Sequence, residues 1–191
     1  HVTGVQTCCS SDLATPAPAA TGALPAAALK YLGGYQDELI ARAAPALLAG
    51  RVLPALAQRY PEPNPARDDR ALFAFVNDMK QRGLRNAPPL ALVAYDSKIK
   101  LLQHALGTHT RISRNHGGQL KARREIRVAS LFKDTPAAFL EMIVAHELAH
   151  LKEPEHDKAF YGLCCHLLPE YHQREFDLRL WLAAEALGER A

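Results

Sequence analysis

The string His146-Glu147-Leu148-Ala149-His150 constrains this chain of 191 residues more than any other feature. Histidines four residues apart on a helix lie on one face, one turn from each other, so both imidazoles can reach a single cation. The glutamate between them is turned sideways, where it can hold a water on that cation without binding the cation itself. This arrangement is typical of zinc hydrolases and predicts a metal site on a helix.

The residues around this string predict the helix that would carry it. Thr135 and Pro136 have the character of an N-cap and a first helical residue. Apolar residues then recur at three- and four-residue spacing, which predicts that one face is buried. The helix is expected to end before Pro154, because the residue preceding a proline is disfavoured in the helical conformation. The apolar stripe consists of Phe139, Leu140, Ile143, Val144, Leu148 and Leu151.

His156 follows this expected helix end and completes the spacing H-E-x-x-H-x-x-x-x-x-H. A break at Glu153-Pro154 lets the chain turn back towards the metal face, which a continued helix would not do. We therefore predict that His146, His150 and His156 bind one zinc ion per chain, since imidazole-only ligation suits zinc. Three protein ligands leave a fourth position for water, which is the pattern of a catalytic site.

Composition is that of an ordinary globular protein, with 48% hydrophobic and 23% charged residues. The formal net charge of +3 is too small to imply a nucleic-acid partner. No apolar run approaches the roughly 20 residues that a transmembrane helix needs, so no membrane association is expected. Residues 1–13 resemble a translated sequencing adapter and residues 14–34 an Ala/Pro-rich linker. The sequence does not indicate the oligomeric state.

The remaining residues predict an α+β protein with a helical N-terminal extension over residues 35–90 and a second region over residues 91–187. Strands are expected at Thr108–Arg114 and Glu125–Phe132, with a turn at Gly117-Gly118 between them. Helices are expected over residues 36–60 (interrupted at Pro45, Gly50 and Pro54), from Asp68 or Asp69 to about Arg82, from Ser97 to Gly107, and over 159–168 and 175–187.

Cys164, Cys165 and His166 are consecutive in one of these helices. Three consecutive helical residues point in different directions and cannot converge on one metal ion. We interpret the two cysteines as buried core thiols of a protein in a reducing compartment.

Residues from about 90 to 182 resemble the YgjP-like metallopeptidase family. The resemblance implies a zincin-like core, in which a small antiparallel sheet accompanies the HExxH helix, with zinc on the three histidines and Glu147 as the catalytic residue. It also implies a bacterial, cytoplasmic protein related in fold to SprT-like proteases. The segments that carry the resemblance are Ile126–Phe132, Thr135-Pro136, Met142–Leu151, His156–Tyr161 and Leu168–Tyr171.

The expected activity is therefore that of a zinc-dependent metallopeptidase acting on a peptide or protein. Zinc would activate a water molecule and polarise the scissile carbonyl, while Glu147 would act as the general base. Candidates for oxyanion or substrate contacts follow the metal motif, namely Tyr161, Tyr171, His172 and Arg174.

A basic segment over residues 111–127 keeps two other functions open. Its simplest interpretation is a solvated hairpin face, but such a hairpin can also contact the phosphates of a nucleotide or a nucleic acid. The first alternative is hydrolysis of a non-peptide bond, such as a nucleotide phosphoanhydride, with Lys121, Arg123 and Arg124 on the phosphates. The second is a non-catalytic domain in which the metal supports the fold, although such a site has no need of Glu147. The basic residues are Arg111, Arg114, Lys121, Arg123, Arg124 and Arg127, against the single acidic residue Glu125.

Overall fold

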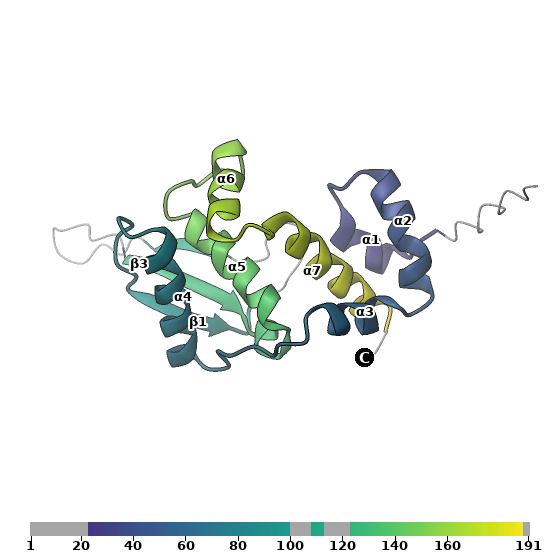
Figure 1. The fold of residues 1–191 in the computed structure, drawn as a ribbon, viewed down its shortest axis with the longest axis horizontal. Helices are drawn as coiled ribbons and strands as arrows, with labels where there is room; N and C mark the ends of the chain where they lie inside the picture. Colours follow the sequence, from purple (N-terminus) through teal and green to yellow (C-terminus); the bar gives the residue numbers. More distant parts are fainter. Residues whose placement is uncertain (1–22, 100–107, 113–122, 189–191) are drawn as a thin grey trace, which may run out of the picture.

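The computed structural model describes residues 23–99, 108–112 and 123–188, which form one small sheet with helices against it and a further group of helices at the other end of the molecule (Figure 1). The α+β class predicted from the sequence is confirmed. The helices are α1 Ala26–Leu32, α2 Asp37–Leu48, α3 Val52–Arg59, α4 Asp69–Gly83, α5 Ala137–Ala149, α6 Lys158–Leu167 and α7 Tyr171–Ala186. The strands are β1 Leu92–Asp96, β2 Thr108–Ile112 and β3 Arg123–Ala129, and a 3-10 helix, η1, covers Ser130–Asp134.

Some predictions lie outside the described residues. These are the adapter-like segment 1–13, the turn at Gly117-Gly118 and residues 100–107 of the helix expected after Ser97. They stay predictions.

The sheet has the order β1-β3-β2, with β3 in the centre. β3 is antiparallel to β2, with Ile126 opposite His109, so the predicted pairing of these two strands is confirmed. β3 is also parallel to β1, which the sequence interpretation did not anticipate; in that pair Val93 lies beside Ile126. The prediction of a purely antiparallel sheet is therefore wrong, because β1 makes the sheet mixed.

The strand predicted to run to Phe132 ends earlier, at Ala129, and the chain continues as η1. Phe132 is fully buried there, so its hydrophobic character reflects a core position outside the sheet. Its carbonyl accepts hydrogen bonds from the Asn64 amide (2.6 Å) and from the Thr135 hydroxyl (3.1 Å). Thr135 is thus engaged with η1, and α5 begins at Ala137 with Pro136 as its N-cap instead of the predicted Thr135 cap.

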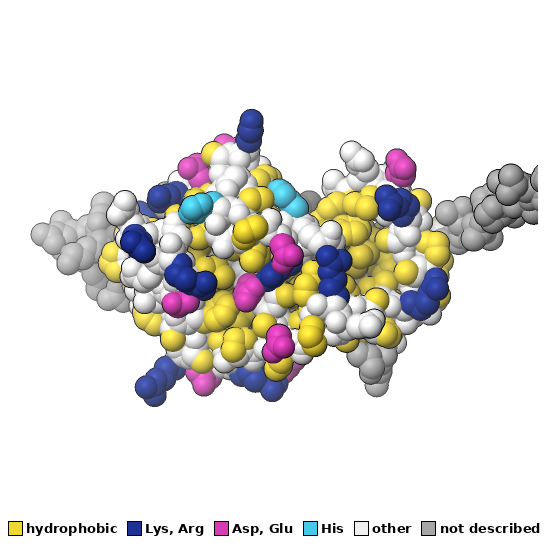
Figure 2. Space-filling model, in the orientation of Figure 1, with side chains coloured by type: hydrophobic (Ala, Val, Ile, Leu, Met, Phe, Trp, Pro, Cys, Tyr) yellow, Lys and Arg dark blue, Asp and Glu magenta, His cyan; other side chains and the backbone are white. Residues whose placement is uncertain are grey.

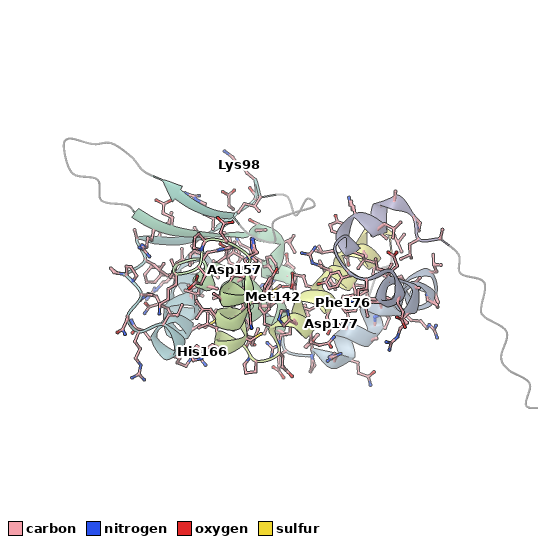
Figure 3. All side chains as sticks on the ribbon, turned by 90° about the horizontal axis from the view of Figure 1, so that it is seen from above. Lys98, Met142, Asp157, His166, Phe176 and Asp177 are labelled. Atoms are coloured by element: carbon pink, nitrogen blue, oxygen red, sulfur yellow. The ribbon has the colours of Figure 1, made fainter. Side chains whose placement is uncertain are left out.

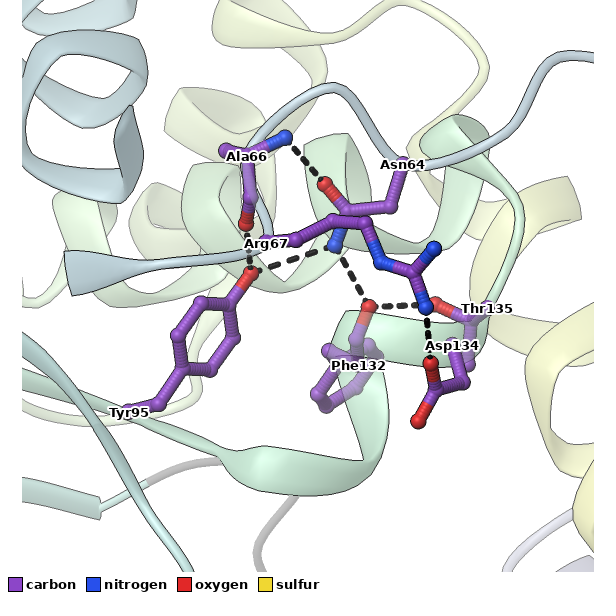
Figure 4. A network of polar contacts seen from close by, with 7 residues as sticks. All are labelled: Asn64, Ala66, Arg67, Tyr95, Phe132, Asp134 and Thr135. Atoms are coloured by element: carbon purple, nitrogen blue, oxygen red, sulfur yellow. Dashed lines mark hydrogen bonds and ion pairs between the residues drawn. The ribbon is translucent and has the colours of Figure 1, made fainter. Parts of the chain in front are cut away.

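Asn64 joins the loop before α4 to the sheet and to η1 (Figure 4). Its side-chain oxygen accepts from the Ala66 amide at 2.6 Å, and its nitrogen donates to the Tyr95 hydroxyl at 3.1 Å as well as to the Phe132 carbonyl. Tyr95 donates in turn to the Ala66 carbonyl. Asn64 is only 5% exposed, so the buried polar groups of this loop are paired with one another.

Helix α5 lies in the middle of the molecule, between β3 and the helices α4, α6 and α7 (Figure 1). The stripe predicted to bury one face underestimates its burial, because every residue from Met142 to Ala149 is buried. A helix that is apolar on all sides belongs in a core. His146 and Glu147 in this helix and its C-cap His150 are buried polar residues within an apolar setting.

Helix α7 connects the sheet-containing part of the molecule with the N-terminal helices, packing on α5 and α6 and also on α1, α2 and α3 (Figure 1). The predicted linker over residues 14–34 is wrong for α1, since Ala28 and Leu32 are fully buried there. The helical region predicted over 36–60 is two helices, α2 and α3, and the predicted interruption at Gly50 is confirmed, since its φ of 62° lies in the left-handed region that favours glycine. The interruptions predicted at Pro45 and Pro54 are wrong, because both prolines lie inside helices.

On the face shown in Figure 2, basic and acidic side chains are interspersed, and hydrophobic side chains gather near α1 and α7. Among the described residues, no single helix is long and apolar enough to span a membrane; α2 and α3 pass that test only as a pair bent by 100°.

Candidate metal centre

The C-terminal end of α5 and the turn that follows it bring three histidines together. His146 lies in the last turn of α5 and His150 is its C-cap residue. The amides of Lys152 and Glu153 both donate to the Ala149 carbonyl, which winds the chain out of the helix before Pro154. The predicted break near Pro154 is thus confirmed, although α5 itself already ends at Ala149.

His156 is fixed by the start of α6. The next residue, Asp157, is the N-cap, and its carboxylate accepts a hydrogen bond of 3.0 Å from the Phe160 amide. This capping interaction sets the direction in which α6 leaves the turn. It holds His156 beside the end of α5, where the sequence interpretation expected the third ligand.

The three imidazoles meet at their Nε2 atoms. The Nε2 of His146 lies 3.2 Å from that of His150 and 3.2 Å from that of His156. All three ligand nitrogens lie within 4.8 Å of one another. Tetrahedral ligands at 2.0–2.1 Å from a zinc ion are about 3.3 Å apart, so the observed spacing suits one ion among the three nitrogens. The residues present therefore fit the predicted metal.

The opposite ring nitrogens of the two helical histidines have partners of their own. The Nδ1 of His146 lies 2.8 Å from the Tyr171 hydroxyl, and the Nδ1 of His150 lies 3.0 Å from the Glu153 carbonyl. A ring that donates its Nδ1 proton keeps its Nε2 lone pair for a metal. Both rings are thus oriented with Nε2 towards the position where the three imidazoles meet.

Burial favours the neutral form of the central imidazole. Desolvation, together with the like charges of the neighbouring His150 and His156, lowers the pKa of His146 to about 3. A metal binds the unprotonated nitrogen, so a histidine that stays neutral over the ordinary pH range needs to lose no proton before it binds.

Glu147 is fully buried, and neither of its carboxylate oxygens has a hydrogen-bond partner in the part of the chain that the structure describes. Burial raises the pKa of Glu147 to about 8. Buried polar atoms are almost always paired, and an unpaired one in a native site calls for a water or an ion. This pair of oxygens fits a site in which a cation and its water complete the environment.

Phe160 forms an apolar wall against all three histidines and was not among the predicted site residues. Its ring centre lies 4.9 Å from that of His146, 4.5 Å from that of His150 and 4.7 Å from that of His156. Phe160 is fully buried, so it excludes water from one side of the cluster. The sequence signal was its place four residues after His156, one helical turn into α6.

The predicted oxyanion or substrate residues lie at different distances from the cluster. Tyr171 is fully buried and contacts His146 directly. The half-buried ring of Tyr161 has its centre 6.5 Å from that of His156, and the exposed His172 lies beyond it, 5.5 Å from Tyr161. Arg174 is paired with Glu141 and Glu170, so its charge is already compensated.

Only part of the basic segment can be placed. Lys121 and the side chain of Arg123 lie outside the described residues. Arg124 lies on the face of β3 that carries the buried Ile126, and its Nη1 donates to the Leu151 carbonyl at 3.1 Å. Leu151 follows His150, so this guanidinium lies at the metal-bearing end of α5. Arg127, on the other face, pairs with Asp96 and Glu125.

Three further features are not part of the three-histidine cluster. His166 is exposed and lies at the margin of the molecule, away from Asp157 at the other end of α6 (Figure 3). Cys164 is buried as predicted, and Cys165 is half-buried. A cavity of about 310 Å³ lies at the opposite end of α5, lined by residues such as Tyr60, Asn64 and Pro136, and it includes none of the predicted site residues.

The α+β fold and the three-histidine cluster with a buried glutamate are those expected of a metal-dependent protein of the HExxH type. The family model described as YgjP-like, metallopeptidase domain, matches residues 60–180, and the chain belongs to this family. The UTP pyrophosphatase of Escherichia coli (strain K12) is 52% identical over 161 residues, which cover 84% of this chain and 96% of that protein. No solved structure matches the chain. Both names are those of hydrolases.

Proposed function

We propose that this protein is a metal-dependent hydrolase of nucleoside triphosphates that acts on UTP and releases pyrophosphate. The observation that carries the proposal is the 52% identity to a UTP pyrophosphatase across 96% of that protein's length. The proposal corresponds to the alternative raised by the basic segment. It takes precedence over peptide cleavage, because the similarity to the pyrophosphatase extends well beyond the metal motif.

The geometry of the site is compatible with this chemistry. A divalent ion on the three histidines, most simply zinc, would supply Lewis acidity to a water molecule and to the phosphoryl group under attack. Glu147 is the general base in this proposal, since its two oxygens have no other partner in the described structure and a cation on the histidines would lower its pKa and favour the carboxylate form. Phe160 keeps bulk water from one side of the reacting groups.

Arg124 is the described residue that we assign to the triphosphate. Its guanidinium lies at the metal-bearing end of α5, with one nitrogen on the Leu151 carbonyl. An arginine presents five donors, so the others remain available to phosphate oxygens. Lys121 and Arg123, near Arg124 in the sequence, are further candidates for the same role.

Peptide cleavage is the second candidate, and the family's description as a metallopeptidase domain favours it. A zinc site with a glutamate base serves amide hydrolysis equally well. An extended peptide would add to the edge strand β2, since β3 is already paired on both sides by β1 and β2. The central strand β3 has no free edge for such an addition.

The test is to measure pyrophosphate release from UTP, and cleavage of an unfolded protein, by the same preparation supplied in parallel with zinc, manganese or magnesium. We expect pyrophosphate release that falls at least a hundredfold in Glu147→Gln, because general-base catalysis typically contributes that much or more. Glu155→Gln, an exposed glutamate in the turn before α6, is the matched control and keeps its activity.

The two substrates separate the hypotheses. Cleavage of the unfolded protein with no pyrophosphate release would establish the peptidase and overturn our proposal. The absence of both activities from a folded, metal-loaded protein would support the non-catalytic alternative. The role of Arg124 is tested by Arg124→Gln, which should raise KM for UTP at least tenfold, whereas Arg127→Gln on the other face of β3 leaves KM unchanged.

A further inference from the structure

The two helical histidines of the cluster are held by different kinds of partner. His150 points its Nδ1 at a backbone carbonyl, that of Glu153, which any residue at that position would supply. His146 points its Nδ1 at a side chain, the hydroxyl of Tyr171, at 2.8 Å. The orientation of His146 therefore depends on the identity of one distant residue, 25 positions further along the chain.

The position of Tyr171 excludes a direct role on the substrate side of the metal. Nδ1 and Nε2 lie on opposite sides of an imidazole ring, and Nε2 of His146 is the atom that meets His150 and His156. The Tyr171 hydroxyl thus lies behind His146, away from the position of the ion. Its side chain is also fully buried. It reaches the reaction only through the histidine.

The Tyr171 hydroxyl has a second polar neighbour, the thiol of Cys164. Cys164 lies one helical turn after Phe160 in α6, and both side chains are fully buried. The inner face of α6 therefore contacts the site twice, through Phe160 on the three rings and through Cys164 on the tyrosine.

The roles of His146, Tyr171 and Cys164 as donor or acceptor follow from the metal-binding tautomer of His146. When Nε2 of His146 faces a metal ion, the ring proton is on Nδ1, so Nδ1–H donates to the Tyr171 oxygen. The tyrosine hydroxyl then has its own hydrogen left to donate, and the Cys164 sulfur is the acceptor beside it.

We propose that Tyr171 is a positioning residue of the metal centre, which fixes the tautomer and the orientation of His146, and that Cys164 orients the Tyr171 hydroxyl. The inference rests on the metal site of the proposed function but not on the identity of its substrate. It assigns a role to the Leu168–Tyr171 segment and to the buried cysteine, neither of which the reaction itself uses.

The first experiment compares the metal affinity of wild type and Tyr171→Phe by competition with a chromogenic chelator, using zinc alone. Phenylalanine fills the same space and removes only the hydroxyl. We expect the dissociation constant for zinc to rise 10–100-fold, the usual effect of losing a partner of a metal-bound histidine. The melting temperature of the metal-free variant reports on folding and should be close to that of the metal-free wild type.

Tyr161→Phe is the matched control, because it deletes the same hydroxyl from a ring 6.3 Å from that of Tyr171. No hydrogen bond joins Tyr161 to the three histidines in the described structure, so its zinc affinity should equal that of wild type. A folded Tyr171→Phe protein with wild-type zinc affinity would overturn the proposal.

Cys164→Ser and Cys164→Ala test whether Cys164 orients the Tyr171 hydroxyl. The two replacements have nearly the same volume, and only serine retains an acceptor for the tyrosine hydroxyl. Zinc affinity should be close to wild type in Cys164→Ser and several-fold weaker in Cys164→Ala. Equal affinities in the two variants would remove Cys164 from the assignment.

A measurement on the unaltered protein decides the matter if Tyr171→Phe fails to fold. The 15N resonances of the histidine rings in the zinc-loaded wild type should show His146 bound through Nε2, with a slowly exchanging proton on Nδ1. A metal-bound Nδ1, or a rapidly exchanging Nδ1 proton, would overturn the proposal. Absence of zinc binding by the wild type would contradict the metal site itself, and absence of UTP hydrolysis by a zinc-loaded protein would contradict only the proposed substrate.

Discussion

The three histidines of the metal centre are unequal in their surroundings. His146 and His150 are each 8% exposed and belong to the rigid end of α5, whereas His156 is exposed and belongs to the turn before α6. The first two are thus held in place by the core with or without an ion. His156 is the candidate ligand that would close the site, and its removal should change the site with the smallest effect on packing.

His156→Ala should therefore lose most of its metal while keeping its fold. Substitutions of exposed side chains usually change the free energy of unfolding by no more than about 0.5 kcal/mol. Elemental mass spectrometry after dialysis should find about one zinc ion per wild-type chain and much less in the variant. His166→Ala removes an exposed histidine from α6 and should leave the metal content unchanged. Equal content in wild type and His156→Ala would place the third ligand elsewhere.

Residue-scale features differed in how far the sequence could predict them. The pair His146 and His150 follows from helix geometry, and His156 follows from the helix-breaking Pro154, so local rules suffice for the ligands. The partner of His146 could not be predicted in the same way. Which side chain reaches its Nδ1 depends on how α7 packs against α5, and Tyr171 was accordingly expected among the substrate contacts.

At the scale of elements, α5 was expected to be amphipathic, but its central position buries it on nearly all sides. The stripe from Phe139 to Leu151 is genuine, but the positions outside it are largely small or apolar residues such as Met142 and Ala145, which are also buried. The whole composition of the helix, and not its strongest face, carried the correct signal.

Strand β1 escaped prediction for a related reason. Leu92-Val93-Ala94-Tyr95 is a short apolar run without strict alternation, and such runs do not distinguish a buried strand from a helix. Its parallel pairing with β3 is a contact between segments about 30 residues apart, which no local pattern specifies.

The loop held by Asn64 offers a test of what keeps the sheet and η1 together. Asn64→Ala leaves the Ala66 amide without its partner and removes one donor from the Phe132 carbonyl. Leaving buried groups unpaired should lower the free energy of unfolding by about 2–3 kcal/mol. Urea denaturation measures this as a lower midpoint, with the exposed Asn86→Ala as the control that changes little. A midpoint equal to wild type would show that water replaces the lost contacts.

At the scale of the whole molecule, we expect metal binding and folding to be coupled. The ligands come from α5 and from the turn before α6, and the partner of His146 comes from α7, so an ion would tie three segments together. A ligand that binds only the folded state at a hundred times its dissociation constant stabilises that state by about 2.7 kcal/mol.

Removal of the metal should consequently lower the melting temperature of the wild type, and restoring zinc should raise it again. The measurement is thermal unfolding with and without a chelator. His156→Ala is the control, because its melting temperature should respond little to either treatment. An identical response in wild type and variant would mean that the ion stabilises the fold through another site.

The family match covers residues 60–180, but α7 runs on to Ala186 and is covered by α1, whose Leu32 is fully buried. A chain cut to the matched residues would lose both the cover and the last turn of the helix that begins with Tyr171. We expect such a fragment to hold zinc more weakly than the full chain, although all three histidines remain. The N-terminal helices pack on α7, so they would support a metal site that lies at the other end of that helix.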